Sequence, residues 1–219
     1  MSARDITPEL LLNAYASGVF PMADSRDDQD MFWVDPNLRG ILPLDNFHIP
    51  RSLKKLVRQN RFNVSVNRDF RGVVSRCAAP ARGRDNTWIS EQIEDLYTDL
   101  HRFGFAHSVE CWLGGTLVGG LYGVCLAGAF FGESMFHTET GASKVALVHL
   151  VARLVKGGFT LLDTQFGTEH LAQFGVIEIP REEYHKRLEL ALSVENADFH
   201  RLEAGLSGDA ILQSITQTS

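Results

Sequence analysis

The chain has 219 residues, of which 44% are hydrophobic and 22% charged, and a net charge of −6. This is an ordinary globular composition, and the length suits one domain or one domain with a small appendage. No apolar run approaches ~18 residues, so we expect neither a membrane-spanning segment nor a membrane partner. The three cysteines form no CxxC pair, which argues against a disulfide framework and a zinc site and favours a cytoplasmic protein.

The N-terminal part combines a helix with an irregular stretch. The segment "ITPELLLNAYASG" predicts a helix that Thr7 caps and Gly18 ends. The next residues, 19–43, are rich in Asp and Pro and predict irregular structure. We place a domain boundary there, between a small N-terminal domain, residues 1–38, and a main domain, residues 39–219.

The following segment is strongly basic. Between Arg51 and Arg84 the chain has ten basic residues and one acid, a net charge of +9 that leaves −15 for the rest. Such a block is typical either of a polyanion site or of a solvated basic face. We expect a helix over 50–60, a strand over 62–66 and a helix capped by Asn67. The candidates for contact with RNA phosphates are Arg51, Lys54, Lys55, Arg58, Arg82 and Arg84.

The second half predicts a sheet framed by helices. A helix over 90–104 precedes three strands that form a meander over 106–134. A buried helix over 143–158 and a strand over 159–165 follow, and then a short helix or turn, a strand and a last helix. The tail after Asn196 is weakly patterned. This order predicts an α+β fold, in which a mixed sheet has helices on both faces, similar to the N-acetyltransferase-like (GNAT-like) fold.

Two carboxylates interrupt apolar runs in this half. Glu133 lies in "AGAFFGESMFH" and Asp163 in "GGFTLLDTQFG". If their strands are parallel neighbours joined by the helix between them, both carboxylates lie at strand ends on one edge of the sheet, where ligands bind. The alternatives for each are a structural ion pair or a helix cap. The polar neighbours Ser134, Thr164 and Gln165 favour a shared site.

Gln165 follows Asp163 by two residues, so on a continuing strand both side chains face the same way. A carboxylate and an amide on one face suit acyl or aminoacyl transfer to an amine. The sequence has no Walker motif, no GxGxxG and no glycine-rich pyrophosphate loop, so we expect no cofactor and no metal. A donor carried by RNA fits these features. Trp33 and Trp88, expected in loops near the basic segment, are then either stacking platforms for a base or core residues.

Two other functions compete with this interpretation. A coenzyme-A-dependent GNAT-type acetyltransferase would need the pyrophosphate loop that the sequence lacks. A non-catalytic RNA-binding module would explain the basic block but not the carboxylates.

Several longer motifs occur in a fixed order between "LLNAYASGVFPM" and "EIPREEY". They include "FWVDPNLRGILP", "NTWI", "FFGESMF" and "LLDTQF". In this order they resemble the bacterial leucyl/phenylalanyl-tRNA–protein transferase family. The resemblance implies a small N-terminal domain and an acetyltransferase-like C-terminal domain. It also implies transfer of Leu or Phe, less readily Met, from aminoacyl-tRNA to proteins or peptides with N-terminal Arg or Lys, which marks them for degradation through the N-degron pathway.

The resemblance further implies roles for individual residues. Asp163 and Gln165 match the family's proposed catalytic pair, and Glu133 matches the glutamate of its "GES" motif. We expect Asp163 to hold the acceptor amine, directly or through Gln165, and to accept or relay its proton, unless the tRNA 2′-hydroxyl carries the proton and Asp163 only positions the amine. Glu133, the third expected catalytic residue, would orient this relay or bind the cationic Arg or Lys of the acceptor. The residues expected to bind the donor are Trp33 and Trp88 at the adenosine end, and Leu121, Phe130 or Phe131, Ser134 and Met135 around the aminoacyl group.

Overall fold

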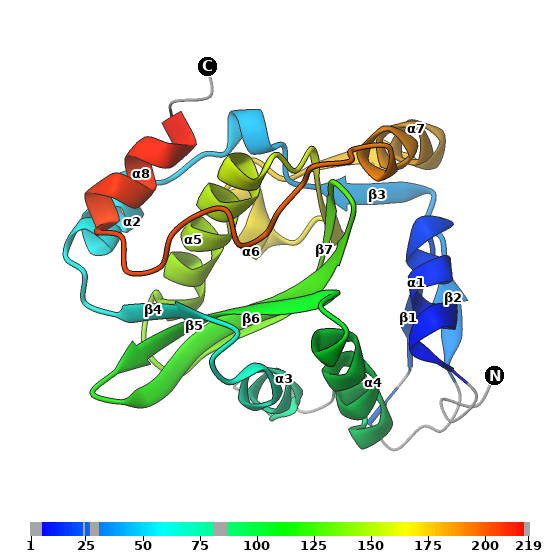
Figure 1. The fold of residues 1–219 in the computed structure, drawn as a ribbon, viewed down its shortest axis with the longest axis horizontal. Coiled ribbons are helices and arrows are strands. Elements are labelled where there is room, and N and C mark those ends of the chain that lie inside the picture. The colour runs from blue at the N-terminus through cyan, green and yellow to red at the C-terminus, as the bar shows by residue number, and fades with distance from the viewer. Residues whose placement is uncertain (1–5, 24, 27–30, 81–86, 217–219) are drawn as a thin grey trace.

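A seven-stranded mixed sheet forms the centre of the computed structural model, which describes residues 6–23, 25–26, 31–80 and 87–216 (Figure 1). Its strands lie in the order β4-β5-β6-β7-β8-β3-β9. Their bounds are β3 Leu38–Ile41, β4 Asn63–Val66, β5 Ala106–Leu113, β6 Thr116–Leu126, β7 Ala129–His137, β8 Leu161–Gln165 and β9 Ile177–Pro180. Strands β7 and β8 run parallel, because a long helix returns the chain between them. The predicted α+β class and mixed sheet are confirmed.

Helices cover both faces of this sheet, as the sequence predicts. On one face lie α1 Pro8–Ala16, α3 Phe70–Ala78, α4 Glu91–Arg102 and α7 Arg181–Leu192. On the other lie α2 Arg51–Arg58, α5 Ala142–Gly157 and α8 Gly208–Thr216. The short α6 Glu169–Ala172 and the 3-10 turn η2 Leu44–Asn46 complete the set. Within the described part of the chain, no helix has both the length and the apolar character needed to cross a membrane.

The predicted helix termini are largely confirmed. The Thr7 hydroxyl accepts a hydrogen bond from the backbone of Leu10 at 3.2 Å and caps α1, which ends before Gly18 in a left-handed conformation. Ser90 caps α4 in the same way. The capping residue of α3 is Asp69, whose side chain accepts from the backbone of Gly72, so the expectation for Asn67 was wrong.

Residues 19–43 contain three short strands, so the expected irregular structure was wrong. Strands β1 Phe20–Met22 and β2 Phe32–Val34 form a separate antiparallel pair, and β3 joins the main sheet. Segments of three or four residues are too short for alternation to indicate a strand. Helix α8 was also missed, because its apolar residues become recognisable only against α2 and α5.

The N-terminal lobe, α1 with β1 and β2, packs beside the sheet at the right of Figure 1. Its residues Leu11, Tyr15 and Phe20 belong to the same apolar cluster as Phe131 of β7. The division of the chain at residue 38 remains a prediction. The packing of the lobe places side chains of α1 directly over β7.

Candidate active site

Glu133 and Asp163 lie on neighbouring parallel strands, as the sequence predicts. The β7–β8 pairing ends with Phe131 opposite Asp163, so Glu133 lies beyond the last paired residue of β7. Strand β6 pairs with Gly132 and with Ser134 but skips Glu133, which is therefore the extra residue of a β-bulge. Glu133 thus lies in the middle of β7, and the expected position at a strand end was wrong. A bulge re-aims a side chain, and here it presents the carboxylate where β7 continues past β8.

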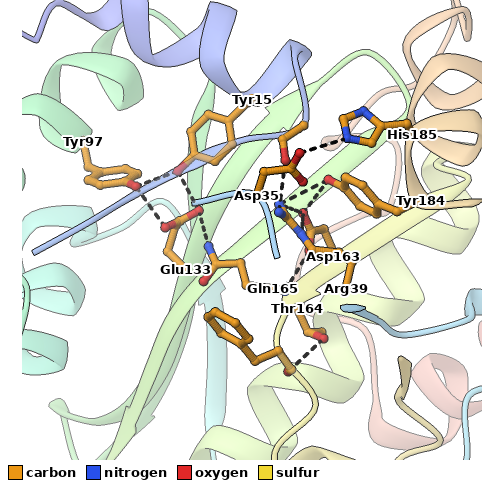
Figure 2. Close-up of polar contacts among 12 residues, drawn as sticks. Tyr15, Asp35, Arg39, Tyr97, Glu133, Asp163, Thr164, Gln165, Tyr184 and His185 are labelled. Carbon is orange, nitrogen blue, oxygen red and sulfur yellow. Dashed lines mark hydrogen bonds and ion pairs between the residues drawn. The ribbon is translucent and has the colours of Figure 1, made fainter. Parts of the chain in front are cut away.

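The Glu133 carboxylate is held by two tyrosines and an amide (Figure 2). The Tyr15 hydroxyl donates to Oε1 at 2.7 Å and the Tyr97 hydroxyl to Oε2 at 2.9 Å. Gln165 Nε2 donates to Oε1 at 3.2 Å. Burial raises the pKa of Glu133 to about 7, although the three hydrogen bonds oppose that rise. Burial also raises the pKa of both tyrosines, so their hydroxyls keep their protons.

The Glu133 carboxyl group and the hydroxyls of Tyr15 and Tyr97 form a ring of contacts. The number of protons in this ring depends on whether Glu133 is ionised. The Tyr15 and Tyr97 hydroxyl oxygens lie 2.6 Å apart, so three close oxygen–oxygen contacts link the two tyrosines and Glu133. With Glu133 ionised, two hydroxyl protons serve these three contacts. With Glu133 protonated, each contact has its own proton and the ring closes head to tail. The ring can therefore take up one proton without losing a contact, while burial is what raises the pKa of Glu133 and the hydrogen bonds from both tyrosines oppose that rise.

Asp163 has a different environment, which is a buried ion pair. Its side chain is fully buried and accepts from Arg39 through Nε at 3.0 Å and through the terminal nitrogen at 2.6 Å. The Tyr184 hydroxyl donates to Oδ2 at 2.7 Å and the backbone of Gln165 donates to Oδ1 at 2.7 Å. The structural ion pair that we weighed from sequence is thus present. It coexists with the site, because Asp163 also binds the backbone of Gln165.

Gln165 connects the two carboxylates. Its backbone has a φ of 62°, which is left-handed and ends the strand. The side chains of Asp163 and Gln165 therefore diverge, the first toward Arg39 and the second toward Glu133 (Figure 2), and the expectation that they share one face was wrong. Because Nε2 donates to Glu133, the amide oxygen of Gln165 is left to accept from another group.

A cavity of about 330 Å³ opens beside Glu133 and Gln165. Its apolar wall comes from β6, β7, α5, β8 and α6, through Leu121, Met135, Leu147, Leu150, Leu162 and Leu171. Three predicted substrate residues, Leu121, Ser134 and Met135, therefore line it. A larger cavity of about 500 Å³, between β4 and the C-terminal segment, contains none of the predicted site residues.

Phe130 and Phe131 do not line this cavity, so that expectation was wrong. Both are fully buried and lie in different apolar clusters on opposite faces of the sheet. The ring of Phe130 stacks on Phe199 at 5.8 Å between ring centroids, and that of Phe131 lies 4.7 Å from Tyr15. Alternation along the strand sends neighbouring side chains to opposite faces, and here both faces are covered.

The two tryptophans are half-buried on the face of the sheet that carries α1 and α4. Trp88 lies in a loop, and its ring meets the edge of the Tyr97 ring at 6.5 Å. Trp33 belongs to β2 and not to a loop. The basic helix α2 buries Leu53 in the cluster on the opposite face, whereas α3, which also belongs to the basic segment, packs in the same cluster as both tryptophans.

Helix α2 exposes its basic face. All four of its predicted phosphate contacts are exposed, namely Arg51, Lys54, Lys55 and Arg58. Arg58 pairs with Asp209 of α8 at 2.9 Å. Arg82 and Arg84 lie outside the described residues.

Comparison with known proteins decides the family. The family model described as "Leucyl/phenylalanyl-tRNA protein transferase" matches residues 41–189, and the model of the corresponding N-terminal domain matches residues 4–37. The chain belongs to the leucyl/phenylalanyl-tRNA–protein transferase family. It is therefore an aminoacyltransferase, and the alternative of a coenzyme-A-dependent acetyltransferase finds no support.

Curated members of the family are similar over nearly the full chain. The member from Phenylobacterium zucineum is 59% identical, with 95% of this chain and 96% of that protein covered. The member from Maricaulis maris is 58% identical, with 99% and 100% covered. Among solved structures, L-PGS from Bacillus licheniformis aligns with a TM-score of 0.43 and 16% identity over 83% of this chain and 68% of that chain, a likeness too weak to carry an argument.

Four residues that contact Glu133 or Asp163 were missed by sequence reasoning, namely Tyr15, Arg39, Tyr97 and Tyr184. Tyr15, Arg39 and Tyr184 lie in motifs that carry the family resemblance, and Tyr97 lies in a predicted helix, but none of the four was given a role in the site. Tyr15 and Tyr97 followed the apolar periodicity of their helices, so a core role explained them. Within "FWVDPNLRGILP", however, Arg39 lies between apolar residues of a motif shared with the family, which was a usable signal.

Proposed function

We propose that this chain transfers Leu or Phe, less readily Met, from aminoacyl-tRNA to proteins or peptides with N-terminal Arg or Lys. The products would be marked for degradation through the N-degron pathway in the cytoplasm. The observation that carries this proposal is one cavity that combines an apolar wall with the polar groups of Glu133 and Gln165. Family membership supplies the reaction class, and the cavity chemistry supports the substrates.

The apolar wall suits the side chain of the donated amino acid. Leu121, Met135 and Leu171 are unbranched at Cβ and can adjust around Leu, Phe or Met. β-branched Ile and Val fit less well, since their stiff χ1 angle leaves fewer ways to enter a narrow cavity.

The polar side of the cavity suits the acceptor. An α-amino group has a pKa of ~7.7–8.0, so a base that titrates near neutrality can take its proton. Glu133 is such a base, because burial raises its pKa to about 7. Its negative charge also favours a basic N-terminal residue in the cavity.

The transfer step then follows. The amine nitrogen, held by the amide oxygen of Gln165, attacks the ester carbonyl carbon, a C–N bond forms, and the bond to the tRNA 3′ oxygen breaks. Glu133 accepts the proton from nitrogen, completes the ring with Tyr15 and Tyr97, and returns the proton to the departing 3′ oxygen. The ester is already activated, so most of the acceleration comes from alignment.

Asp163 acts on this step from a distance. Its oxygens are occupied by Arg39, Tyr184 and the backbone of Gln165. We therefore propose a positioning function for Asp163 and assign proton uptake to Glu133. Of the two roles that the sequence left open for Asp163, this is the one that its contacts support.

The donor tRNA would lie across both faces of the site. Trp88, beside Tyr97, is suited to stack the terminal adenosine, while the exposed basic face of α2 is suited to more distant phosphates. We also propose that the main domain is GNAT-like, which the meander followed by the parallel β7–α5–β8 unit supports, and that it begins after residue 38.

A transfer assay tests the proposal. Labelled Leu, Phe, Met or Ile on tRNA is incubated with peptides that begin with Arg, Lys or Ala. We expect transfer of Leu, Phe and Met to the Arg and Lys peptides, with Ile and the Ala peptide inactive. Equal transfer to the Ala peptide would overturn the acceptor assignment, and equal transfer of Ile would overturn the assignment of the cavity.

A further inference from the structure

Arg39 joins the N-terminal lobe to the turn at Gln165, where β8 ends. Its side chain is only 1% exposed, and one terminal nitrogen donates to the backbone oxygen of Gly18, in the lobe, at 3.0 Å. The guanidinium is sandwiched between the rings of Phe20 and Tyr184, at 4.3 and 4.4 Å from their centroids. Its Nε and its other terminal nitrogen donate to the Asp163 carboxylate (Figure 2). Burial by itself lowers the pKa of Arg39, but the bonds and charge of Asp163 outweigh it and the net pKa is raised.

The same carboxylate restrains the backbone of Gln165. Asp163 Oδ1 accepts both from Arg39 Nε and from the Gln165 N–H. A left-handed φ at a residue other than glycine is costly and persists only where surrounding contacts impose it. Next to Arg39, Gly40 packs so closely under the turn that an added Cβ would lie 2.5 Å from the carbonyl carbon of Phe166. The turn is therefore fixed from β3 on two sides.

We propose that Arg39 is a positioning residue for aminoacyl transfer, which holds Gln165 toward Glu133 through Asp163 and ties that arrangement to the seating of the N-terminal lobe. The inference rests on the proposed function of Gln165. It predicts that the lobe contributes to the rate of transfer through Gly18 and Arg39, in addition to supplying Tyr15.

Lysine cannot replace Arg39 in this arrangement. The guanidinium is a planar fork that binds both carboxylate oxygens, a backbone oxygen and two ring faces at once. A lysine ammonium keeps the charge but offers one nitrogen and no plane for stacking. Arg39→Lys therefore keeps the positive charge at residue 39 but removes the planar group that makes several contacts at once, so its effect reports on that geometry.

A matched pair of variants tests the proposal, with Arg153→Lys as the control. Arg153 is also a buried arginine, 6% exposed, with two carbonyl partners in the C-terminal segment and the Phe199 ring at 5.3 Å. Each variant is assayed for kcat, for the KM of charged tRNA, for Tm, and for hydrogen exchange at the backbone amide (N–H) of Gln165. We expect Arg39→Lys to lower kcat by about 10²-fold with KM unchanged, and to lose protection at the Gln165 amide. Arg153→Lys lowers Tm but leaves kcat and that amide unchanged.

Other outcomes are equally decisive. If Arg39→Lys lowers only Tm, as the control does, Arg39 is merely structural and the proposal fails. If Arg39→Lys does not fold, Tyr184→Phe removes one donor to Asp163 while keeping the ring over Arg39, and an unchanged kcat and Gln165 amide there would overturn the proposal. If the wild type transfers nothing to Arg peptides, the proposed function fails, whereas the amide measurement still tests the link from Arg39 to Gln165.

Discussion

Gln165 Nε2 donates a 3.2 Å hydrogen bond to Glu133 Oε1, although 32 positions and a helix separate the two residues in the chain. The bond crosses from β8 to β7 at the point where their backbone pairing has ended. It fixes the orientation of the amide group, so that the amide oxygen and not the nitrogen is offered to an incoming amine. Substitutions at either end of this bond, and around it, should therefore change the rate of transfer.

Gln165→Ala removes the group that we propose holds the amine. We expect kcat to fall by roughly 10²–10³-fold with little change in Tm, since Gln165 is half-buried and at a strand end. Gln173→Ala is the control, because Gln173 bonds Lys144 and does not line the cavity. An equal effect of both substitutions on kcat would contradict the role of Gln165.

The rate of transfer should depend on the protonation of Glu133. A general base must be ionised, so kcat is low below the pKa of Glu133, about 7, and rises through it. In Glu133→Gln the rate is much lower and this limb of the pH profile is absent. A wild-type profile that stays flat from about pH 5.5 to about pH 8 would remove Glu133 from proton transfer.

The same carboxylate makes stability depend on pH. The pKa of Glu133 is about 7 in the fold and 4.5 as an ordinary value. Between these values the folded state keeps a proton that the unfolded state has released, so Glu133 lowers the free energy of unfolding as pH rises through this range, by on the order of 3 kcal/mol. Denaturant titrations should therefore show Glu133→Gln gaining stability relative to wild type between about pH 5 and about pH 8. A constant difference would contradict the raised pKa.

Tyr97→Phe tests the hydrogen bond that the Tyr97 hydroxyl donates to Glu133. The Tyr97 hydroxyl lowers the pKa of Glu133 by donating to it. Its removal should therefore raise that pKa and move the rising limb of the kcat profile to higher pH. The substitution should cause no further shift in a Glu133→Gln background, where the limb is absent. A move to lower pH would mean that the hydroxyl does not stabilise the ionised form.

The basic face of α2 should make donor binding sensitive to salt. Lys54→Ala and Lys55→Ala together should weaken binding of charged tRNA and reduce the slope of log affinity against log salt by about one for each phosphate that is no longer neutralised. Lys186→Ala, an exposed lysine on α7 across the sheet, is the control. Titrations at several salt concentrations measure the slope, and an unchanged slope would rule α2 out as a phosphate site.

Leu171 should help to set the size of the accepted side chain. It is half-buried in the cavity wall, so Leu171→Phe narrows the cavity without overfilling the core. We expect transfer of Phe to fall more than transfer of Leu when the two donors compete. Leu190→Phe, on the exposed side of α7, should leave the ratio unchanged. A reduction that is equal for both donors would place the aminoacyl side chain elsewhere.

The sequence determined the elements that local chemistry specifies. Capping residues and apolar periodicity identified α1, α4 and α5, and the two interrupted apolar runs identified β7 and β8 with their carboxylates. Family motifs then indicated the reaction. The helix caps and apolar runs are readable because each depends on residues a few positions apart.

Only the tertiary structure decided which hydrogen-bond partners each of the two carboxylates has. Glu133 receives hydrogen bonds from Tyr15 and Tyr97 on two different helices, and Asp163 receives them from Arg39 in a third distant segment. The bulge at Glu133 and the left-handed turn at Gln165 set the directions of both side chains. Hydrogen bonding and burial act between segments that the chain brings together only on folding, so residue types alone marked both carboxylates as candidates, and the folded contacts are the basis on which we propose one as a base and the other as a support.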